Sequence, residues 1–347
     1  RVELPTYAFQ HARYWIEAPS VVGDVASAGL DAADHPLLGA AVMLADSDGS
    51  VLTGRLSVAA QPWLADHRIG DAVLFPGTGF VELAIRAGDQ VGADTLDELT
   101  LQAPLVLPER GGVQVQVVVG GSDASGGRTV VIRSRAEGDP RLPWTAHADG
   151  VLVADSAREP VSELRQWPPA GAERIDVSDT YTRLGELGYG YGPAFQGLRA
   201  LWRSGDDVYA EIALDERGGH DAERFGLHPA LLDACLHPAI AVDAQEDGRG
   251  TDGAAVLPFT WQGVTLHAAG ASAVRVRVRP VGENTVALLL ADPTGSPVAT
   301  VRALVSRPVQ VDRLAAAPQE FVDSLFRVEW PETAVGAEAP AVQVVSV

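Results

Sequence analysis

One apolar helical segment, set among short extended runs, limits the folds open to this chain. In residues 76–88, four apolar side chains recur at the i, i+3, i+4, i+7 spacing of a buried helical face: Phe80, Leu83, Ala84 and Ala87. Pro76 precedes the first turn, and Gly88 lies where such a helix is expected to end. A single apolar helix among strands predicts a sheet that wraps around it.

Hairpin patterns surround this helix and are then repeated. Residues 46–49 form a turn between runs 42–44 and 51–56, a glycine-rich turn joins 113–119 to 129–133, and 144–153 is a further strand. The later half has a hairpin over 201–204 and 208–214, a helix from Pro229 through His237, and strands at 273–279, 285–291 and 298–305. The sequence therefore predicts an α+β protein of two similar halves, each a sheet around one central helix.

Composition narrows the classes of function. The chain has 347 residues, a formal net charge of −20 and only arginine among its 26 basic residues. Such a charge repels a polyanion, so we expect no nucleic-acid partner. No apolar run approaches the ~18 residues that cross a bilayer and no leader pattern opens the chain, so we expect no membrane partner and a cytoplasmic location. The single Cys235 rules out an internal disulfide and suits a reducing compartment.

His67 is the first candidate for chemistry. It lies nine residues before Pro76, just ahead of the predicted helix. The first amides of that helix, where Gly77 and Gly79 leave the backbone open, are donors suited to a thioester carbonyl and to the enolate formed when its α-proton leaves. A hydrogen-bonded core histidine is the alternative interpretation of His67 taken alone.

Asp233 is the second candidate. It lies in the apolar segment 227–237, where an aspartate is costly to bury unless it has a use. Burial raises a carboxyl pKa, which favours a role as a proton donor. His237 follows at i+4 on the predicted helix, so its imidazole is placed to hydrogen-bond and orient the carboxyl group. The alternative is an Asp–His pair that only fastens the helix.

Four stretches resemble, in family order, the motifs of dehydratase domains of modular type I polyketide synthases, relatives of the fatty-acid synthase dehydratase. They are His67 to Pro76, Gly188-Tyr189-Gly190-Tyr191-Gly192-Pro193-Ala194-Phe195, Asp233 to His237, and Leu257-Pro258-Phe259-Thr260-Trp261. The resemblance covers about residues 35–308. The opening is similar to the tail that follows an acyltransferase domain, and Phe326–Trp330 resembles the approach to a ketoreductase region.

The resemblance implies a double-hotdog fold and a division of the chain. The expected parts are a linker at 1–34, a first hotdog with His67 at 35–154, a Pro- and Ser-rich linker at 155–173, a second hotdog with Asp233 at 174–309, and a linker toward a ketoreductase region at 310–347. Neighbouring acyltransferase and ketoreductase domains of the same polypeptide, an acyl carrier protein and a second copy of the chain are the implied partners.

The resemblance also implies a hydro-lyase that removes water from a β-hydroxyacyl thioester during polyketide chain extension. His67 takes the α-proton as general base, and Asp233 protonates the departing hydroxyl. His237, which is glutamine in other members, supports Asp233, while Tyr191, Gly192 and Pro193 shape the pocket and Pro76 and Gly77 open the central helix. No cofactor or metal is expected beyond the phosphopantetheine that carries the substrate.

One departure concerns the histidine motif. The family usually has glycine four residues after the histidine, whereas this chain has Gly70 at three and Asp71 at four. A carboxylate near the site is expected to disturb His67, and it leaves a non-catalytic spacer domain as one alternative. A hotdog thioesterase or cyclase-like relative is a second, and a metal enzyme built on His67, Asp233 and His237 is a third.

The remaining polar residues have plainer interpretations. Cys235 is predicted to be a buried structural thiol rather than a nucleophile. The arginines that alternate along 275–279 are predicted to be solvated, with docking of an acidic carrier protein as the alternative. Four histidines show no partner in the sequence: His35, His147, His220 and His267.

Overall fold

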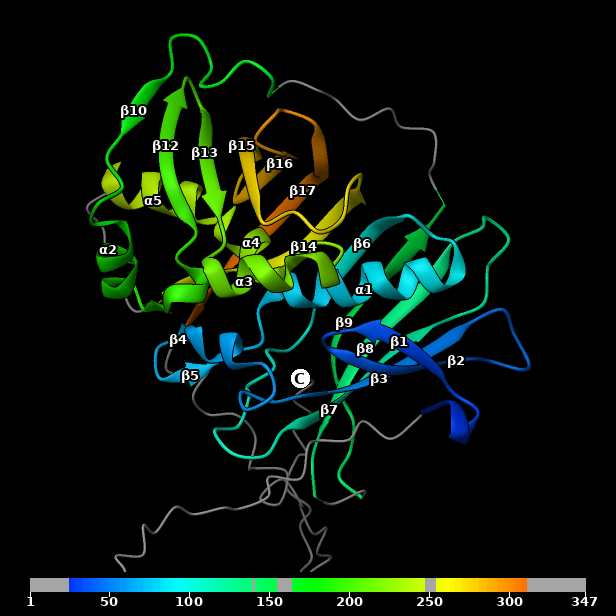
Figure 1. Ribbon diagram of the computed structural model, residues 1–347. Helices are drawn as coiled ribbons and strands as arrows, with labels where there is room; N and C mark the ends of the chain where they lie inside the picture. Colours follow the sequence, from blue (N-terminus) through cyan, green and yellow to red (C-terminus); the bar gives the residue numbers. More distant parts are fainter. Residues whose placement is uncertain (1–24, 139–140, 155–163, 247–253, 311–347) are drawn as a thin grey trace, which may run out of the picture. The chain divides into compact units, whose positions relative to one another are not determined.

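The computed structural model describes residues 25–138, 141–154, 164–246 and 254–310 (Figure 1). All described elements belong to one compact unit. The stretches predicted to resemble flanking linkers, 1–24 and 311–347, and the linker residues 155–163 lie outside the described residues, so those predictions stay predictions.

One antiparallel sheet of 14 strands runs through the molecule, and its first seven strands form the first half. In spatial order they are β1 (Asp31–His35), β2 (Leu38–Met43), β3 (Ser50–Leu56), β7 (Val113–Val119), β8 (Arg128–Ala136), β9 (Thr145–Val153) and β6 (Thr95–Leu101). β1 begins inside the segment predicted as linker 1–34, because no turn signal separates it from the aspartate-rich run before it.

The other seven strands form the second half. In order they are β14 (Ala254–Leu266), β17 (Pro297–Gln310), β16 (Thr285–Ala291), β15 (Ala273–Gly282), β13 (Asp207–Ala213), β12 (Leu198–Ser204) and β10 (Glu173–Ile175). A separate small sheet has the order β11 (Tyr189–Tyr191), β4 (His67–Ile69) and β5 (Ala72–Val73), so it joins a strand of the second half to two of the first.

The central helix of the first half is α1 (Gly77–Val91), and it confirms the predicted apolar face. The four predicted face residues are all buried, and the helix contacts β6 and β7. It continues past Gly88 and ends instead at Gly92, which adopts a left-handed conformation with φ 69°. Gly88 is a packing position, because a Cβ there would lie 2.5 Å from the carbonyl oxygen of Ala93.

The predicted single helix from Pro229 through His237 is wrong, because the structure has two helices here. α4 (Pro229–Ala234) ends before a turn at Cys235 and Leu236, and α5 (His237–Glu246) begins at His237. The physical reason is Pro238, which has no N–H to donate to the carbonyl of Ala234 and is suited to the start of a new helix. The second half is therefore built around two short helices rather than one long one.

The remaining helices are short. They are α2 (Thr180–Glu186) and α3 (Glu216–Asp221), with 3-10 turns at Val25–Ala28, Pro62–Asp66, Pro193–Phe195 and Ala222–Arg224. No single helix among the described residues is long and apolar enough to cross a membrane; one pair, Glu216–Arg224 with Pro229–Val242, meets the limits of length and composition together but is bent by 118°.

The two halves meet where β6 pairs with β14. Hydroxyl groups join the strands across this seam, with Thr100 3.3 Å from Thr260 and Thr95 3.2 Å from Thr265. β14 also contains Pro258, which lies next to a register shift in the pairing with β17, so the missing N–H is tolerated there. The seam makes the buried core continuous between the halves.

Candidate active site

His67 lies at the start of β4, opposite Tyr191 of β11, and its side chain is buried. Its Nδ1 lies 2.9 Å from the carbonyl oxygen of Leu74. Because a carbonyl oxygen only accepts, Nδ1 carries the proton of the neutral ring and Nε2 presents a lone pair. The backbone of β4 and β5 thus fixes both the orientation and the tautomer of His67.

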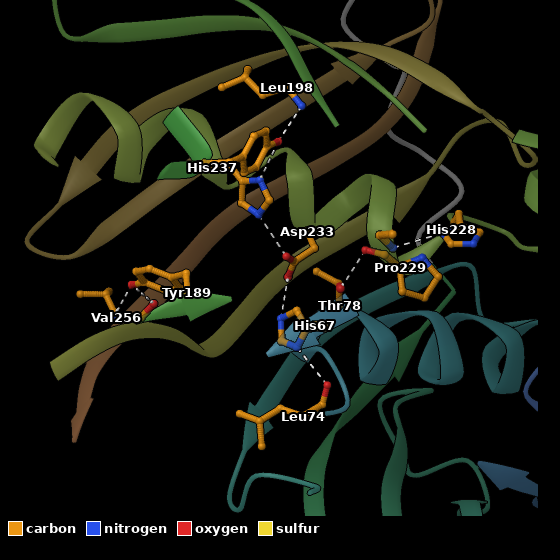
Figure 2. A network of polar contacts seen from close by, with 12 residues as sticks. His67, Leu74, Thr78, Tyr189, Leu198, His228, Pro229, Asp233, His237 and Val256 are labelled. Atoms are coloured by element: carbon orange, nitrogen blue, oxygen red, sulfur yellow. Dashed lines mark hydrogen bonds and ion pairs between the residues drawn. The ribbon is translucent and has the colours of Figure 1, made fainter. Parts of the chain in front are cut away.

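Asp233 lies in α4, and its carboxyl group is buried between two imidazoles (Figure 2). Oδ1 is 3.8 Å from Nε2 of His67, and Oδ2 is 3.2 Å from Nε2 of His237. The predicted partnership of Asp233 and His237 is present even though a turn separates their helices. The structure therefore brings the histidine of the first half and the aspartate of the second half together.

Burial controls the protonation of His67. Loss of solvent lowers the pKa of the ring below its ordinary 6.5, an effect opposed by the negative charge of Asp233 and by the Leu74 carbonyl and assisted by His237. Asp71, which was expected to disturb this ring, is exposed in the turn between β4 and β5 and does not contribute to the shift. That expectation was wrong, because Gly70 takes φ 56° and closes the hairpin with the carboxylate outside the site.

The start of α1 borders the same space. Pro76 caps the helix without a side-chain hydrogen bond, and Gly79 donates its N–H to the Pro76 carbonyl at 2.8 Å. The amides of Gly77 and Thr78 lie in the first turn, where no intrahelical acceptor exists. A Cβ at Gly77 would come within 3.1 Å of Leu101, so the predicted glycine keeps the backbone accessible beside the site.

Tyr191, Gly192 and Pro193 form the opposite wall. The Tyr191 ring lies over His237 with centroids 4.2 Å apart, and burial raises the pKa of its hydroxyl well above the ordinary value. Gly192 packs so tightly against Asp66 that a Cβ would lie 2.4 Å from the Asp66 carboxyl carbon, and Pro193 opens a 3-10 turn. Asp66 fastens this turn, because its Oδ2 accepts from the Ala194 N–H at 2.9 Å.

A cavity of about 860 Å³ contains the reacting groups. His67, Asp233, Gly77 and Tyr191 all line it. Most of the remaining wall is apolar and includes Phe75, Phe80, Leu101, Leu236, Ile240 and Val256. A space of this kind accepts an extended hydrocarbon chain and places few polar groups beside it.

Sequence reasoning missed Glu82. This buried carboxylate of α1 accepts from the N–H groups of Gly226 and Leu227, each at 2.8 Å. It also accepts from Nε2 of His35 at 3.0 Å, and His35 Nδ1 accepts from the Leu37 N–H. The only sequence signal was a charged residue one turn from Thr78 within a buried helix, a weak one because exposed helix faces are rich in glutamate.

His228 was quoted in a motif but given no role. Its Nδ1 accepts from the Ala230 N–H at 3.2 Å and so caps α4, and burial lowers its pKa to about 4. The four histidines without a predicted partner also have one. His35 binds Glu82, His147 binds Ser134, His220 binds the Glu216 carbonyl and His267 binds Thr300.

The prediction for Cys235 is confirmed, because the thiol is buried and burial raises its pKa. The prediction of solvated arginines is wrong for two of them. Arg275 donates to the Leu164 carbonyl and lies over the Trp167 ring, and Arg279 forms an ion pair with Asp207 at 2.7 Å. Among the described residues, no three His, Cys, Asp or Glu side chains converge as a metal site, and Asp233 lies between the two histidines of the proposed metal set.

Solved structures define the class of this architecture as a double-hotdog dehydratase. The dehydratase domain from the terminal module of the rifamycin polyketide synthase matches with a TM-score of 0.77 and 47% identity over 82% of this chain and all of that domain. Two inactive mutants of the CurK dehydratase, one with histidine changed to phenylalanine and one with aspartate changed to asparagine, match at 0.70 and 28% identity over 81% of this chain and 99% of theirs.

The chain belongs to the polyketide synthase dehydratase family. A family model described as polyketide synthase dehydratase domain matches residues 35–135, and one described as polyketide synthase dehydratase N-terminal domain matches residues 159–316. Polyketide synthase GfsA of Streptomyces halstedii is 57% identical over 98% of this chain, which spans 5% of that protein's length. The protein is thus a hydro-lyase that forms double bonds during polyketide chain extension.

Proposed function

We propose that His67 is the general base and Asp233 the general acid in the dehydration of a β-hydroxyacyl thioester carried on phosphopantetheine. The observation that carries this assignment is the 3.8 Å distance between His67 Nε2 and Asp233 Oδ1 beside one apolar cavity. The two inactive CurK mutants change a histidine to phenylalanine and an aspartate to asparagine, which supports the same pair of residue types.

The reaction needs one proton removed and one delivered. The lone pair of His67 Nε2 takes the α-proton, and the electrons of that C–H bond form the new double bond. The β C–O bond breaks as Asp233 gives its proton to the leaving oxygen, which departs as water. Atoms 3.8 Å apart reach the same face of the substrate, so proton and hydroxyl leave from one side.

The start of α1 supplies the third element of the mechanism. Negative charge develops on the thioester oxygen as the α-proton leaves, and the Gly77 amide lies at the cavity wall with no intrahelical acceptor. A preorganised N–H directed at developing charge stabilises the enolate more than the ground state. We assign Gly77 to this role, with the absent Cβ admitting the thioester.

The partners follow from the relatives, which are large multidomain synthases. We propose that an acyl carrier protein delivers the substrate, that acyltransferase and ketoreductase domains flank this domain in one cytoplasmic polypeptide, and that two copies associate. The residues assigned here need no cofactor or metal of their own.

A panel of β-hydroxyacyl carrier thioesters tests the proposal by mass spectrometry of the carrier-bound product. We expect loss of one water with the thioester intact. Release of a free acid would identify a thioesterase, and a cyclic product would identify a cyclase. If no thioester in the panel changes, the domain is a structural spacer and the assignment fails.

A further inference from the structure

Tyr181 contacts the far side of the His237 ring. It lies in α2, and its hydroxyl is 3.3 Å from Nδ1 of His237, while Nε2 of the same ring is 3.2 Å from Oδ2 of Asp233. The same hydroxyl accepts from the backbone N–H of Leu198 at 2.8 Å. Figure 2 follows these contacts from Leu198 through His237 and Asp233 to His67.

The Leu198 amide sets the direction of this chain of hydrogen bonds. A backbone N–H can only donate, so the Tyr181 oxygen is an acceptor in that bond and its own proton is left for another partner. Burial raises the pKa of the phenol, so the proton stays on the oxygen across the working pH range. Among the described residues its other hydrogen-bond partner is His237 Nδ1, which therefore accepts.

An acceptor at Nδ1 places the ring proton of neutral His237 on Nε2. That N–H faces Oδ2 of Asp233, which is then occupied as an acceptor. The proton that Asp233 carries as an acid must then lie on Oδ1, the oxygen nearer His67 Nε2. In the other tautomer the bare Nε2 would draw the carboxyl proton onto Oδ2, away from the reacting groups.

We propose that Tyr181 is a positioning residue that selects the Nε2–H tautomer of His237 and thereby directs the acid proton of Asp233 to Oδ1. This inference rests on the proposed role of Asp233 as the general acid. It also explains why glutamine suits position 237, because an amide offers a carbonyl acceptor toward Tyr181 and an N–H donor toward Asp233.

Nitrogen NMR of protein carrying ¹⁵N-labelled histidine tests the tautomer directly, without an activity measurement. The signals of His237 are those missing from the spectrum of His237→Gln. We expect Nδ1 to have the shift of a bare ring nitrogen and Nε2 that of a protonated one, and Tyr181→Phe to abolish or reverse this difference. A protonated Nδ1 in the parent protein would overturn the proposal, whether or not Asp233 is the acid.

Kinetics provide the second test. Tyr181→Phe should lower kcat roughly 10-fold with KM unchanged, since the lost contact supports a catalytic group rather than the substrate. In a His237→Ala background it should cause no further loss, because Tyr181 acts through that ring. Tyr209→Phe is the matched control, since it removes a tyrosine hydroxyl bonded to Asp207 on another strand. An equal loss from Tyr181→Phe in both backgrounds would contradict the proposal.

Unfolding and a wrong role for Asp233 remain distinguishable from failure of this inference. Tyr181→Phe leaves the Leu198 N–H without its acceptor, so its melting temperature is measured beside kcat, and the spectrum of the parent protein stands even if the variant is unstable. His237→Gln should retain most activity. Full activity in Asp233→Asn would refute the proposed acid and leave the tautomer result unaffected.

Discussion

At the scale of single residues, the base and the acid are held in different ways. His67 is fixed by the backbone through the Leu74 carbonyl, whereas Asp233 is held through His237 and Tyr181. The first arrangement makes the tautomer of His67 independent of every other side chain. The second makes the state of Asp233 depend on a series of hydrogen bonds.

Replacing either residue should remove dehydration without unfolding the domain. His67→Phe fills the same space but offers no lone pair, and Asp233→Asn keeps the size of the group but is a poor proton donor. We expect activity below a tenth of the parent rate in both, measured as carrier-bound alkene by mass spectrometry, with melting temperatures near that of the parent. A His67→Phe protein that exceeds this rate would exclude His67 as the base.

The pH profile should reflect the burial of His67. A base works in its neutral form, and burial lowers the His67 pKa, so the neutral ring persists below pH 6.5. The acidic limb of kcat/KM should therefore lie below pH 6.5 and fall as the ring becomes protonated. Initial rates across a pH series check this, and a limb above pH 6.5 would show that the opposing charge of Asp233 outweighs burial.

At the scale of elements, α1 holds the acid helix in place. Thr78 donates to the Pro229 carbonyl at 3.0 Å, and Glu82, one turn later, binds the two amides just before His228. One face of α1 therefore positions the start of α4 against the helix end that carries the Gly77 amide. Asp233 and the enolate donor share this support.

Glu82→Gln should weaken both stability and turnover. All three partners of Glu82 donate, so the amide NH₂ of glutamine must face a donor. We expect a loss of about 1–3 kcal/mol in the free energy of unfolding, typical of an unsatisfied buried group, and a lower kcat. Urea unfolding and steady-state kinetics check this, with the exposed Glu98→Gln as a control that should match the parent.

Local patterns predicted some elements and not others. The hairpin around Asp46 and Gly49 was found because turn residues and strands are neighbours in sequence. The seam was missed, because β6 and β14 pair over a separation of 160 residues, as between Thr100 and Thr260, and Pro258 argues against a strand. The split between α4 and α5 was signalled by Pro238, but the apolar run obscured it.

The site was predicted as far as its motifs reach. His67 and Asp233 stand in recognisable segments, and the spacing of Asp233 and His237 indicated their contact. Tyr181 and Glu82 lie in no such segment, and their partners are 56 and up to 145 residues away in the chain. Only the folded backbone brings those groups together.

At the scale of the whole molecule, the continuous sheet and the shared core should make the two halves unfold together. We expect one calorimetric transition, and amides of β8 and β15 that exchange with the same free energy of opening. Leu290→Ala, in the core of the second half, should lower that free energy by about 2–5 kcal/mol for both strands. The exposed Val281→Ala is the control. A second transition, or β8 amides unaffected by Leu290→Ala, would show that the halves are independent.

The seam also decides how this domain can be recombined. The base lies in one half and the acid in the other, so a gene crossover between β9 and β10 would combine a base from one parent with an acid helix from another. The α1 contacts that set their distance would then join residues of different ancestry. For the engineer who splices synthases, β1 through β17 is one unit of exchange, and junctions belong outside it.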